Sequence, residues 1–291
     1  MIGIRDDLKD LFPESSFDDF FAIDGETVKH VVASRRIFRF ERGGRHFYMK
    51  AHYGVGWAEI FKNLLQLKKP IIGAENEWQA IRAFSQPGVE IATTPLAAWG
   101  KQGWNPARQR SFIITDALDN TVDLEHWLPE LEQWTEQAER LNMKRAVIRR
   151  LGDIARRLHS NGLNHRDFYL CHFRLDMSKA APLPKVEELQ LYLMDLHRVE
   201  QRVVMPERWA VKDIAGLLYS TLFDSKGINV NRSDIIRFID AYSEKGWRDA
   251  LVNQREFLLK VLQRVMRTYK KDHGVPPPWP AFLQKMYEQI S

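Results

Sequence analysis

The amino-acid sequence predicts an α+β fold of two lobes, a small β-rich lobe followed by a larger helical one. Three β-rich segments lie near the start of the chain. In the second half, a helical pattern leads into the triplet His165-Arg166-Asp167, and a later apolar strand ends at Asp195. A loop of this kind followed by such a strand is how protein-kinase-like folds build a site for phosphoryl transfer. We therefore predict a bilobal, protein-kinase-like fold.

The first lobe is predicted from β-rich segments at residues 28–33, 37–41 and 45–50. Gly43-Gly44 supplies the turn between the second and the third. Lys50 closes the third strand, which is where kinase-like lobes carry the lysine that contacts the α- and β-phosphates of ATP. An exposed lysine on an edge strand is the alternative, and the order of the other parts along the chain favours the ATP role.

Residues 75–82 form the next predicted helix, where a kinase-like lobe carries a glutamate that pairs with the lysine. Glu77 is our choice and Glu75 the second; a surface charge on a helix is the alternative for Glu77. No Gly-x-Gly-x-x-Gly cradle separates the first two strands. Arg35 and Arg36 stand there instead and can form charge-assisted hydrogen bonds with phosphate oxygens, unless they are only a solvated hairpin tip.

Residues 111–118 form an apolar strand that runs into a connector. Its order along the chain predicts the hinge between the lobes, where backbone groups near Asp116 and Leu118 would meet the adenine of ATP. Composition alone would describe it as any buried strand. We place the domain boundary here, with an amino-terminal lobe and its extension at residues 1–118 and a carboxyl-terminal lobe at residues 119–291.

The second lobe begins its site with a helix at residues 151–161, which an Asn-Gly pair ends and which leads into the triplet. Short strands are predicted at residues 172–175 and 189–194. Their hairpin brings Asp167 and Asp195 to neighbouring strand ends. Asp167 can orient an attacking hydroxyl and accept its proton, and Asp195 can hold the magnesium ion that bridges the phosphates. Ordinary capping of a turn and of a strand end is the alternative.

Residues 196–212 contain no Ser, Thr or Tyr, so they cannot be an activation loop that phosphorylation orders. This argues against a protein kinase. The segment is basic, which matches an anionic acceptor, although each arginine could also belong to a solvated face. Asp213 begins the next helix and can brace the loop of the triplet through backbone N–H groups; a helix-terminal charge is the alternative.

The composition bounds the class of protein and its partners. With 291 residues, 44% of them hydrophobic and 28% charged, the chain is typical of a soluble globular protein with room for two lobes. A net charge of +5 predicts an anionic partner: a nucleotide, a phosphorylated glycan, an acidic lipid surface or an acidic protein. The single cysteine, Cys171, excludes an intrachain disulfide and suits a reducing cytoplasm. We expect no secretion signal and no membrane span.

Two basic amphipathic stretches, residues 57–65 and 257–271, carry apolar residues on one helical face. Ordinary packing against the core is the favoured interpretation of both. Contact with a membrane surface is the alternative, since the charge is positive and the first stretch begins with Trp57.

Several motifs together carry a resemblance to a known family. The block HRDFYLCHF at residues 165–173 is far more specific than the triplet, and MDLHR follows at residues 194–198. Similar stretches are SRRIFRFERGGRHFYMK, HYGVGWAEIFKNLL, GAENEWQAIRAF, NPARQRSFIITDAL and RWAVKDIA. In these motifs the chain closely resembles the lipopolysaccharide core heptose(I) kinases of Gram-negative bacteria.

The resemblance implies roles for the candidate residues. Asp167 is implied as the base, with His165 and Arg166 in its catalytic loop. Asp195 is implied as the magnesium ligand. Lys50 would bind the phosphates, with Glu77 as its partner. His52, Gly54 and Gly56 would shape the entrance of the site.

His172 is a departure from the usual pattern, because ordinary kinases carry a metal-binding Asn five residues after the catalytic Asp. Imidazole is a softer ligand or a hydrogen-bond donor. Three roles stay open for His172: a metal ligand, a group that orients Asp167 or a phosphate, and a plain anchor for its strand. Whether one or two metal ions bind therefore stays open too.

The activity that the resemblance implies is transfer of phosphate from ATP, with Mg²⁺, to heptose I of the lipopolysaccharide inner core. The acceptor would be core–lipid A, and no nucleic acid is expected. The expected place is the cytoplasm, with peripheral contact at the inner face of the inner membrane, and an acidic protein partner fits the positive charge. The alternatives are a kinase for Kdo or another small molecule, and a kinase-like protein that binds without catalysis.

Overall fold

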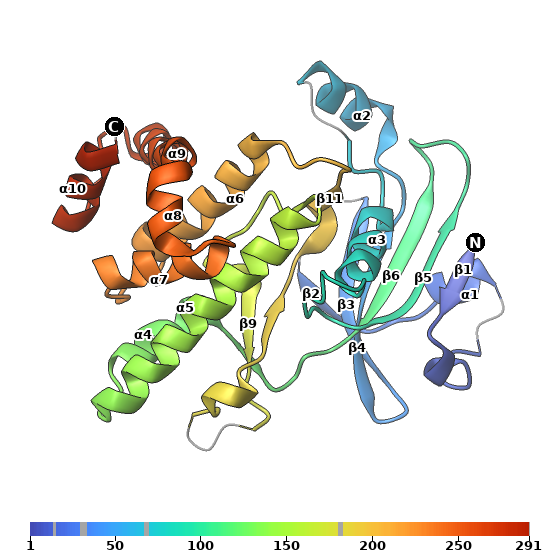
Figure 1. The fold of residues 1–291 in the computed structure, drawn as a ribbon. Helices are drawn as coiled ribbons and strands as arrows, with labels where there is room; N and C mark the ends of the chain where they lie inside the picture. Colours follow the sequence, from blue (N-terminus) through green and yellow to red (C-terminus); the bar gives the residue numbers. More distant parts are fainter. Residues whose placement is uncertain (14–15, 30–33, 67–69, 180–182, 291) are drawn as a thin grey trace. The chain divides into compact units, whose positions relative to one another are not determined.

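The computed structural model describes residues 1–13, 16–29, 34–66, 70–179 and 183–290 (Figure 1). Its contacts divide the chain into two compact units. The first unit holds Met1–Ser85, Thr93–Asp119 and Asp195–Val199, and the second holds Gln86–Ala92, Asn120–Met194 and Glu200–Ser291. Residues 86–92 and 195–199 therefore group differently from a single division near residue 119. The functional roles of the two predicted lobes stay predictions.

A six-stranded antiparallel sheet forms the first unit, in the order β1-β5-β6-β4-β3-β2 (Figure 1). Its strands are β1 (Ile2–Ile4), β2 (Glu26–Lys29), β3 (Arg35–Arg42), β4 (Arg45–His52), β5 (Leu96–Gln102) and β6 (Arg110–Asp116). The strands predicted at residues 37–41 and 45–50 lie within β3 and β4. Gly43 and Gly44 both have positive φ, 58° and 70°, as a tight hairpin turn requires. Of the strand predicted at residues 28–33, residues 30–33 lie outside the described residues.

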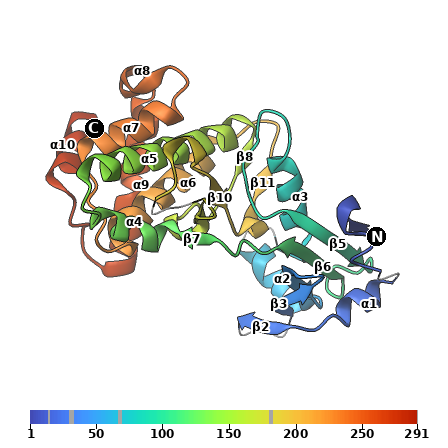
Figure 2. The ribbon, with the colours of Figure 1, turned by 90° about the horizontal axis from the view of Figure 1, so that it is seen from below.

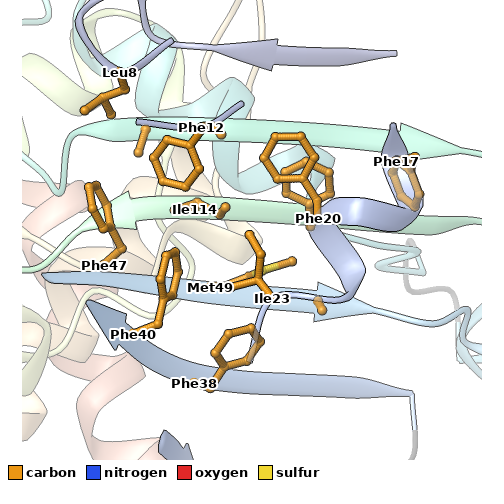
Figure 3. Packing of buried hydrophobic residues seen from close by; sticks show 14 residues of the cluster. Leu8, Phe12, Phe17, Phe20, Ile23, Phe38, Phe40, Phe47, Met49 and Ile114 are labelled. Atoms are coloured by element: carbon orange, nitrogen blue, oxygen red, sulfur yellow. The ribbon is translucent and has the colours of Figure 1, made fainter. Parts of the chain in front are cut away.

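One face of this sheet carries a core of aromatic side chains (Figure 3). The amino-terminal segment, with η1 (Asp6–Leu8) and α1 (Phe17–Phe21), covers this face. Buried members of the core include Leu8, Phe12, Phe20, Phe38, Phe40, Phe47, Met49 and Ile114. Successive side chains of a strand point to opposite faces. Because Met49 and Ala51 belong to this core, Lys50 between them points to the other face of the sheet.

Helix α3 (Glu75–Phe84) covers that other face. Its buried Trp78 contacts Trp99 of β5, with 5.1 Å between the ring centroids. Trp99 points away from the aromatic core, because its neighbour Ala98 belongs to that core. Between β4 and α3 lies α2 (Gly56–Leu65), where Ile60 is buried but Trp57 and Phe61 are 49% and 56% exposed. The prediction that the apolar face of residues 57–65 packs against the core is therefore wrong for most of that face. The short helix η4 (Leu196–Arg198) packs against α3.

The second unit is mainly helical (Figure 2). Its strands form two small sheets, ordered β10-β9-β7 and β11-β8. The strands are β7 (Thr121–Asp123), β8 (Leu163–Asn164), β9 (Phe173–Asp176), β10 (Leu191–Leu193) and β11 (Glu200–Gln201). The helices are α4 (Leu124–Glu132), α5 (Gln137–Ser160), α6 (Glu207–Tyr219), α7 (Arg232–Tyr242), α8 (Gly246–Asn253), α9 (Arg255–His273) and α10 (Ala281–Ile290), with short helical turns η2 (Leu170–His172), η3 (Val186–Glu188) and η5 (Ser220–Asp224).

Close packing of helices builds this unit, with α5 against α7 and α6 against α9 (Figure 2). A Cβ atom added to Gly152 of α5 would lie 2.8 Å from the carbonyl oxygen of Phe238 in α7, so glycine permits this approach. The apolar face predicted at residues 257–271 packs inward, since Val261, Leu262 and Val265 of α9 are buried. Within the described ranges, no helix combines the length and apolar character needed to cross a membrane.

Candidate active site

Lys50 and Glu77 form an ion pair in the first unit. Strand β4 points Lys50 toward α3, which carries Glu77 on the facing side, and Lys50 Nζ lies 2.7 Å from Glu77 Oε1. The side chains are only 25% and 9% exposed. Burial acts to lower the pKa of Lys50, but the charge and hydrogen bond of Glu77, together with the charge of Asp195, raise it above its ordinary value. The lysine is therefore a fixed cation. Glu75, the second choice, pairs instead with Lys101 at 2.7 Å.

Asp195 belongs to the same unit as Lys50. Its backbone is left-handed, with φ 58° and ψ 57°, at the start of η4. His197 Nδ1 lies 2.7 Å from Asp195 Oδ1, and Asn76 of α3 donates to the carbonyl oxygen of His197 at 3.5 Å. The Asp195 side chain is 39% exposed. Asp195 is thus a partly exposed carboxylate whose charge acts on Lys50.

Positive groups gather around Lys50. Burial, followed by the charges of Arg35, Lys50 and His197, lowers the pKa of the buried His52 to about 4. His52 is therefore neutral at pH 7. Arg35 is paired in the sheet register with His52, and both lie on the face of Lys50 because β-strand side chains alternate. The result is a surface suited to an anion.

Arg36 lies on the opposite face from Arg35, the aromatic one. Its guanidinium pairs with Asp24 and lies over the Phe38 ring, 4.6 Å from the ring centroid. The two arginines that the sequence predicted together are thus separated by the alternation of β3, and only Arg35 shares a face with Lys50.

The predicted hinge residues occupy the end of β6 and the connector after it. The Asp116 carboxylate pairs with Arg5 at 2.9 Å and with Arg45 at 3.2 Å. Its backbone N–H donates to the carbonyl oxygen of Pro95. The carboxylate and the backbone N–H of Asp116 therefore both have partners within the protein. Leu118 follows in the connector.

In the second unit, Asp213 of α6 holds the loop of the triplet. Asp213 is fully buried, and its two carboxylate oxygens accept the backbone N–H groups of His165 and Arg166, each at 2.7 Å. Arg166 has φ 74°, a left-handed conformation that costs a non-glycine residue about 1–3 kcal/mol. The expected bracing of this loop by Asp213 is thus confirmed, and it stabilises a strained backbone beside Asp167.

Histidines fix the positions of the residues on either side of this loop. His165 is fully buried, and burial lowers its pKa despite the opposing charge of Asp213. The neutral ring donates from Nε2 to the carbonyl oxygen of Met194 at 2.9 Å. His172 Nδ1 lies 2.7 Å from the carbonyl oxygen of Asp167, which can only accept, so Nδ1 carries the proton. Met194, which precedes Asp195 in the chain, donates to the carbonyl oxygen of His172 at 2.8 Å.

The Arg166 side chain points to an internal carboxylate. Its NH1 lies 3.3 Å from Glu200 Oε1, and its guanidinium lies over the Trp209 ring, 4.9 Å from the centroid. Arg202 also pairs with Glu200. Glu200 is in β11, which pairs with β8 just before the triplet. The arginine of the triplet is therefore neutralised by a carboxylate of the same unit.

Helix α6 and the turn after it contact the rest of the loop. Ser220 Oγ accepts the backbone N–H of Leu170 at 2.9 Å. A Cβ atom on Gly216 would lie 3.1 Å from the Tyr169 ring. Sequence reasoning missed Ser220, Gly216 and Glu200. Gly216 and Ser220 follow Asp213 at successive spacings of three and four residues, so helical periodicity could have identified them. Glu200 could not be found in this way, because its position depends on the pairing of β11 with β8.

The predicted site residues thus fall into two groups. Lys50, Glu77 and Asp195 lie in the first unit together with Arg35. His165, Arg166, Asp167 and His172 lie in the second unit. The Asp195 carboxylate suits Mg²⁺, a hard cation that proteins bind through one or two carboxylates while substrate phosphates and water complete its octahedron. Among the described residues, no three His, Cys, Asp or Glu side chains form a complete protein cage for a metal ion.

Known proteins are similar to this chain in sequence and in fold. A model of the lipopolysaccharide kinase (Kdo/WaaP) family matches residues 19–242. The chain belongs to this family. Lipopolysaccharide core heptose(I) kinase WaaP of Pseudomonas aeruginosa is 36% identical over 255 residues, 88% of this chain and 90% of that protein. The protein of that name from Escherichia coli is 36% identical over 242 residues, 83% and 86% of the two chains.

A solved structure agrees with these relatives. The structure of WaaP in complex with acyl carrier protein has a TM-score of 0.73 and 31% identity, and the match covers 92% of this chain and 99% of that one. The predicted protein-kinase-like fold is therefore confirmed, as is the family resemblance. Membership in this kinase family makes the chain an ATP-dependent sugar kinase.

Proposed function

We propose that the chain phosphorylates heptose I of the lipopolysaccharide inner core, using ATP and Mg²⁺. The observation that carries the proposal is the buried Lys50–Glu77 pair with Asp195 as a neighbouring charge. This arrangement of lysine, glutamate and aspartate is what kinases need to bind the phosphates of ATP. The relatives named as heptose(I) kinases support the choice of acceptor.

In the proposed reaction Asp167 orients the sugar hydroxyl and accepts its proton. The hydroxyl oxygen forms a bond to the γ-phosphorus, the bond from that phosphorus to the oxygen it shares with the β-phosphate breaks, and ADP leaves. Lys50 and Arg35 bind phosphate oxygens, and connector residue Leu118 remains the candidate for adenine contact. Positioning and charge stabilisation supply most of the rate in such transfers.

Asp195 is the proposed ligand of Mg²⁺, which when bound neutralises charge on the phosphates. His172 is the proposed ligand of a second ion, which it would hold through Nε2, because Nδ1 donates to the carbonyl oxygen of Asp167. A metal-binding histidine commonly donates its other ring nitrogen to a carbonyl in this way. One or two ions thus remain alternatives, which metal titration of His172→Ala would separate.

We propose that the acceptor sugar enters a polar cavity of about 380 Å³ in the second unit. Tyr169 and Lys212 line it, together with Asp224 and Asp272. Burial and the charges of Glu125 and Asp272 raise the pKa of Asp224. Carboxylates and hydroxyls are suitable hydrogen-bond partners for a polyol. Asp224→Asn should raise KM for the acceptor and leave KM for ATP unchanged.

The proposed place is the cytoplasm at the inner face of the inner membrane, with the exposed Trp57 and Phe61 of α2 as the contact. An acidic carrier protein is the proposed partner, because the chain is basic and a structural relative was solved with acyl carrier protein. The positive charge favours association with such an anionic partner. Nucleic acid is not a proposed partner.

Radiolabelled phosphate transfer from ATP to defined acceptors tests the function. Core–lipid A that ends at heptose I should be labelled, while lipid A carrying only Kdo should not. Labelling of the Kdo acceptor alone would instead identify a Kdo kinase. Nucleotide binding without transfer to either acceptor would favour a kinase-like binding protein. Asp167→Ala should lower turnover by about 10²–10⁴-fold while the fold is kept.

A further inference from the structure

Lys212 of α6 lies beside the carboxylate of Asp167. Its Nζ is 4.0 Å from Asp167 Oδ1, and the same Nζ donates to the carbonyl oxygen of Arg166. The side chains of Lys212 and Asp167 are only 20% and 13% exposed. Their interaction is therefore less screened by water than a surface pair.

The loop itself supplies no cation after Arg166 until His172, since the residues between are Asp167, Phe168, Tyr169, Leu170 and Cys171. The guanidinium of Arg166 is held by Glu200 and the Trp209 ring. A positive charge next to Asp167 is thus delivered by a helix that lies far along the chain.

Two consecutive residues of α6 contact the two sides of the loop backbone. Asp213 accepts the N–H groups of His165 and Arg166, while Lys212 donates to the carbonyl oxygen of Arg166. The strained residue Arg166 is therefore held from both its donor and its acceptor side. Asp167 follows it directly, so its direction depends on this grip.

We propose that Lys212 is a positioning residue for the phosphoryl transfer, which holds Asp167 in its reactive orientation and keeps a positive charge beside it. The inference rests on the proposed function, in which Asp167 is the base. Lys212 also lines the cavity proposed for the acceptor sugar, so its charge lies at the edge of that cavity.

The test compares Lys212→Met with Lys271→Met, which removes an exposed lysine of α9. We expect kcat of the Lys212 variant to fall about 10²-fold, the lower end of the loss that follows removal of one preorganised hydrogen-bond donor from an active site. KM for ATP should match that of the control. Added ethylammonium should raise the rate of Lys212→Ala, because it restores a cation in the vacated space.

A kcat of Lys212→Met equal to that of the control would overturn the proposal. So would a loss of rate in Lys212→Ala that no alkylammonium ion relieves. If the methionine variant does not fold, Lys212→Arg serves as the test, because arginine keeps the positive charge. A folded arginine variant that is as slow as Asp167→Ala would overturn the proposal. Absence of transfer by the wild-type chain to any core acceptor is a different result, which rejects the proposed function itself.

Discussion

Two lysines of the sheet form equally short ion pairs with glutamates of α3, so a comparison of the two lysines tests the proposed role of Lys50 in binding ATP. Lys50 pairs with Glu77, and Lys101 pairs with Glu75, each at 2.7 Å. Lys50→Met should lower kcat/KM for ATP by about 10²–10³-fold, since a cation on the phosphates is lost. Lys101→Met should stay near wild type. Steady-state kinetics at varied ATP would check both, and equal losses in the two variants would refute the assigned role of Lys50.

His52 makes stability depend on pH in a direction that can be worked out. Burial lowers its pKa to about 4, below the ordinary value of 6.5. The unfolded chain therefore binds the proton more readily than the folded one. The contribution of neutral His52 to the free energy of unfolding is complete above pH 6.5 and is lost as pH falls toward 4. The loss amounts to about 3 kcal/mol from this residue.

Urea unfolding at pH 7 and pH 4.5 would measure the effect. His52→Gln should reduce the difference between the two free energies of unfolding, whereas His126→Gln, which changes an exposed histidine, should not. An unchanged difference in His52→Gln would show that other groups, such as His165, carry the pH dependence.

Candidate residues that stand in a known order along the chain could be named from the sequence, whereas contacts that only the fold creates could not. Lys50, Glu77, Asp167 and Asp195 were chosen in this way, because kinase-like folds keep that order. The contacts of Lys212 with Asp167 and of Glu200 with Arg166 could not be predicted, because they depend on how α6 and β11 meet the loop. No local pattern encodes that geometry.

At the scale of the strand, Arg35 and Arg36 are neighbouring arginines of β3 that lie on opposite faces of the sheet, so each is a control for the other. Arg35 lies on the face of Lys50, and Arg36 pairs with Asp24 on the aromatic face. Arg35→Ala should raise KM for ATP several-fold, because charge-assisted bonds to phosphate are lost. Arg36→Ala should change KM little. The reverse pattern in the two KM values would mean that nucleotide binds from the aromatic side.

The helix α2 exposes an apolar face that the sequence pattern alone assigned to the core. Periodicity identifies an amphipathic helix, but it does not say what covers the apolar side. We expect Trp57→Ser with Phe61→Ser to weaken binding to vesicles of anionic lipid, measured by co-sedimentation, and to leave transfer to a detergent-dispersed acceptor unchanged. Ile60→Ser, at the buried position, should instead lower the thermal midpoint. Undiminished vesicle binding by the double variant would exclude this face as the contact.

For the whole molecule, the net charge of +5 predicts a dependence on salt. Attraction between a basic protein and a phosphorylated acceptor is screened over about 10 Å at 0.1 M salt. KM for core–lipid A should therefore rise as NaCl increases, while kcat changes less. A neutral sugar analogue is the control, and a KM that does not respond to salt would argue against long-range attraction.

The fold class could be predicted from the sequence, because the strand signals, the helix signals and the triplet follow one another along the chain in the order of a kinase-like fold. The grouping of residues 195–199 with the first unit could not, since it depends on contacts of η4 with α3 rather than on composition.

The pairing of Arg166 with Glu200 also bears on control of the enzyme in the cell. A carboxylate that is encoded in the gene, unlike an added phosphate, cannot be removed by a phosphatase. We therefore expect that holding Arg166 in place needs no phosphorylation of the chain, and that treatment with a phosphatase leaves the rate of transfer unchanged.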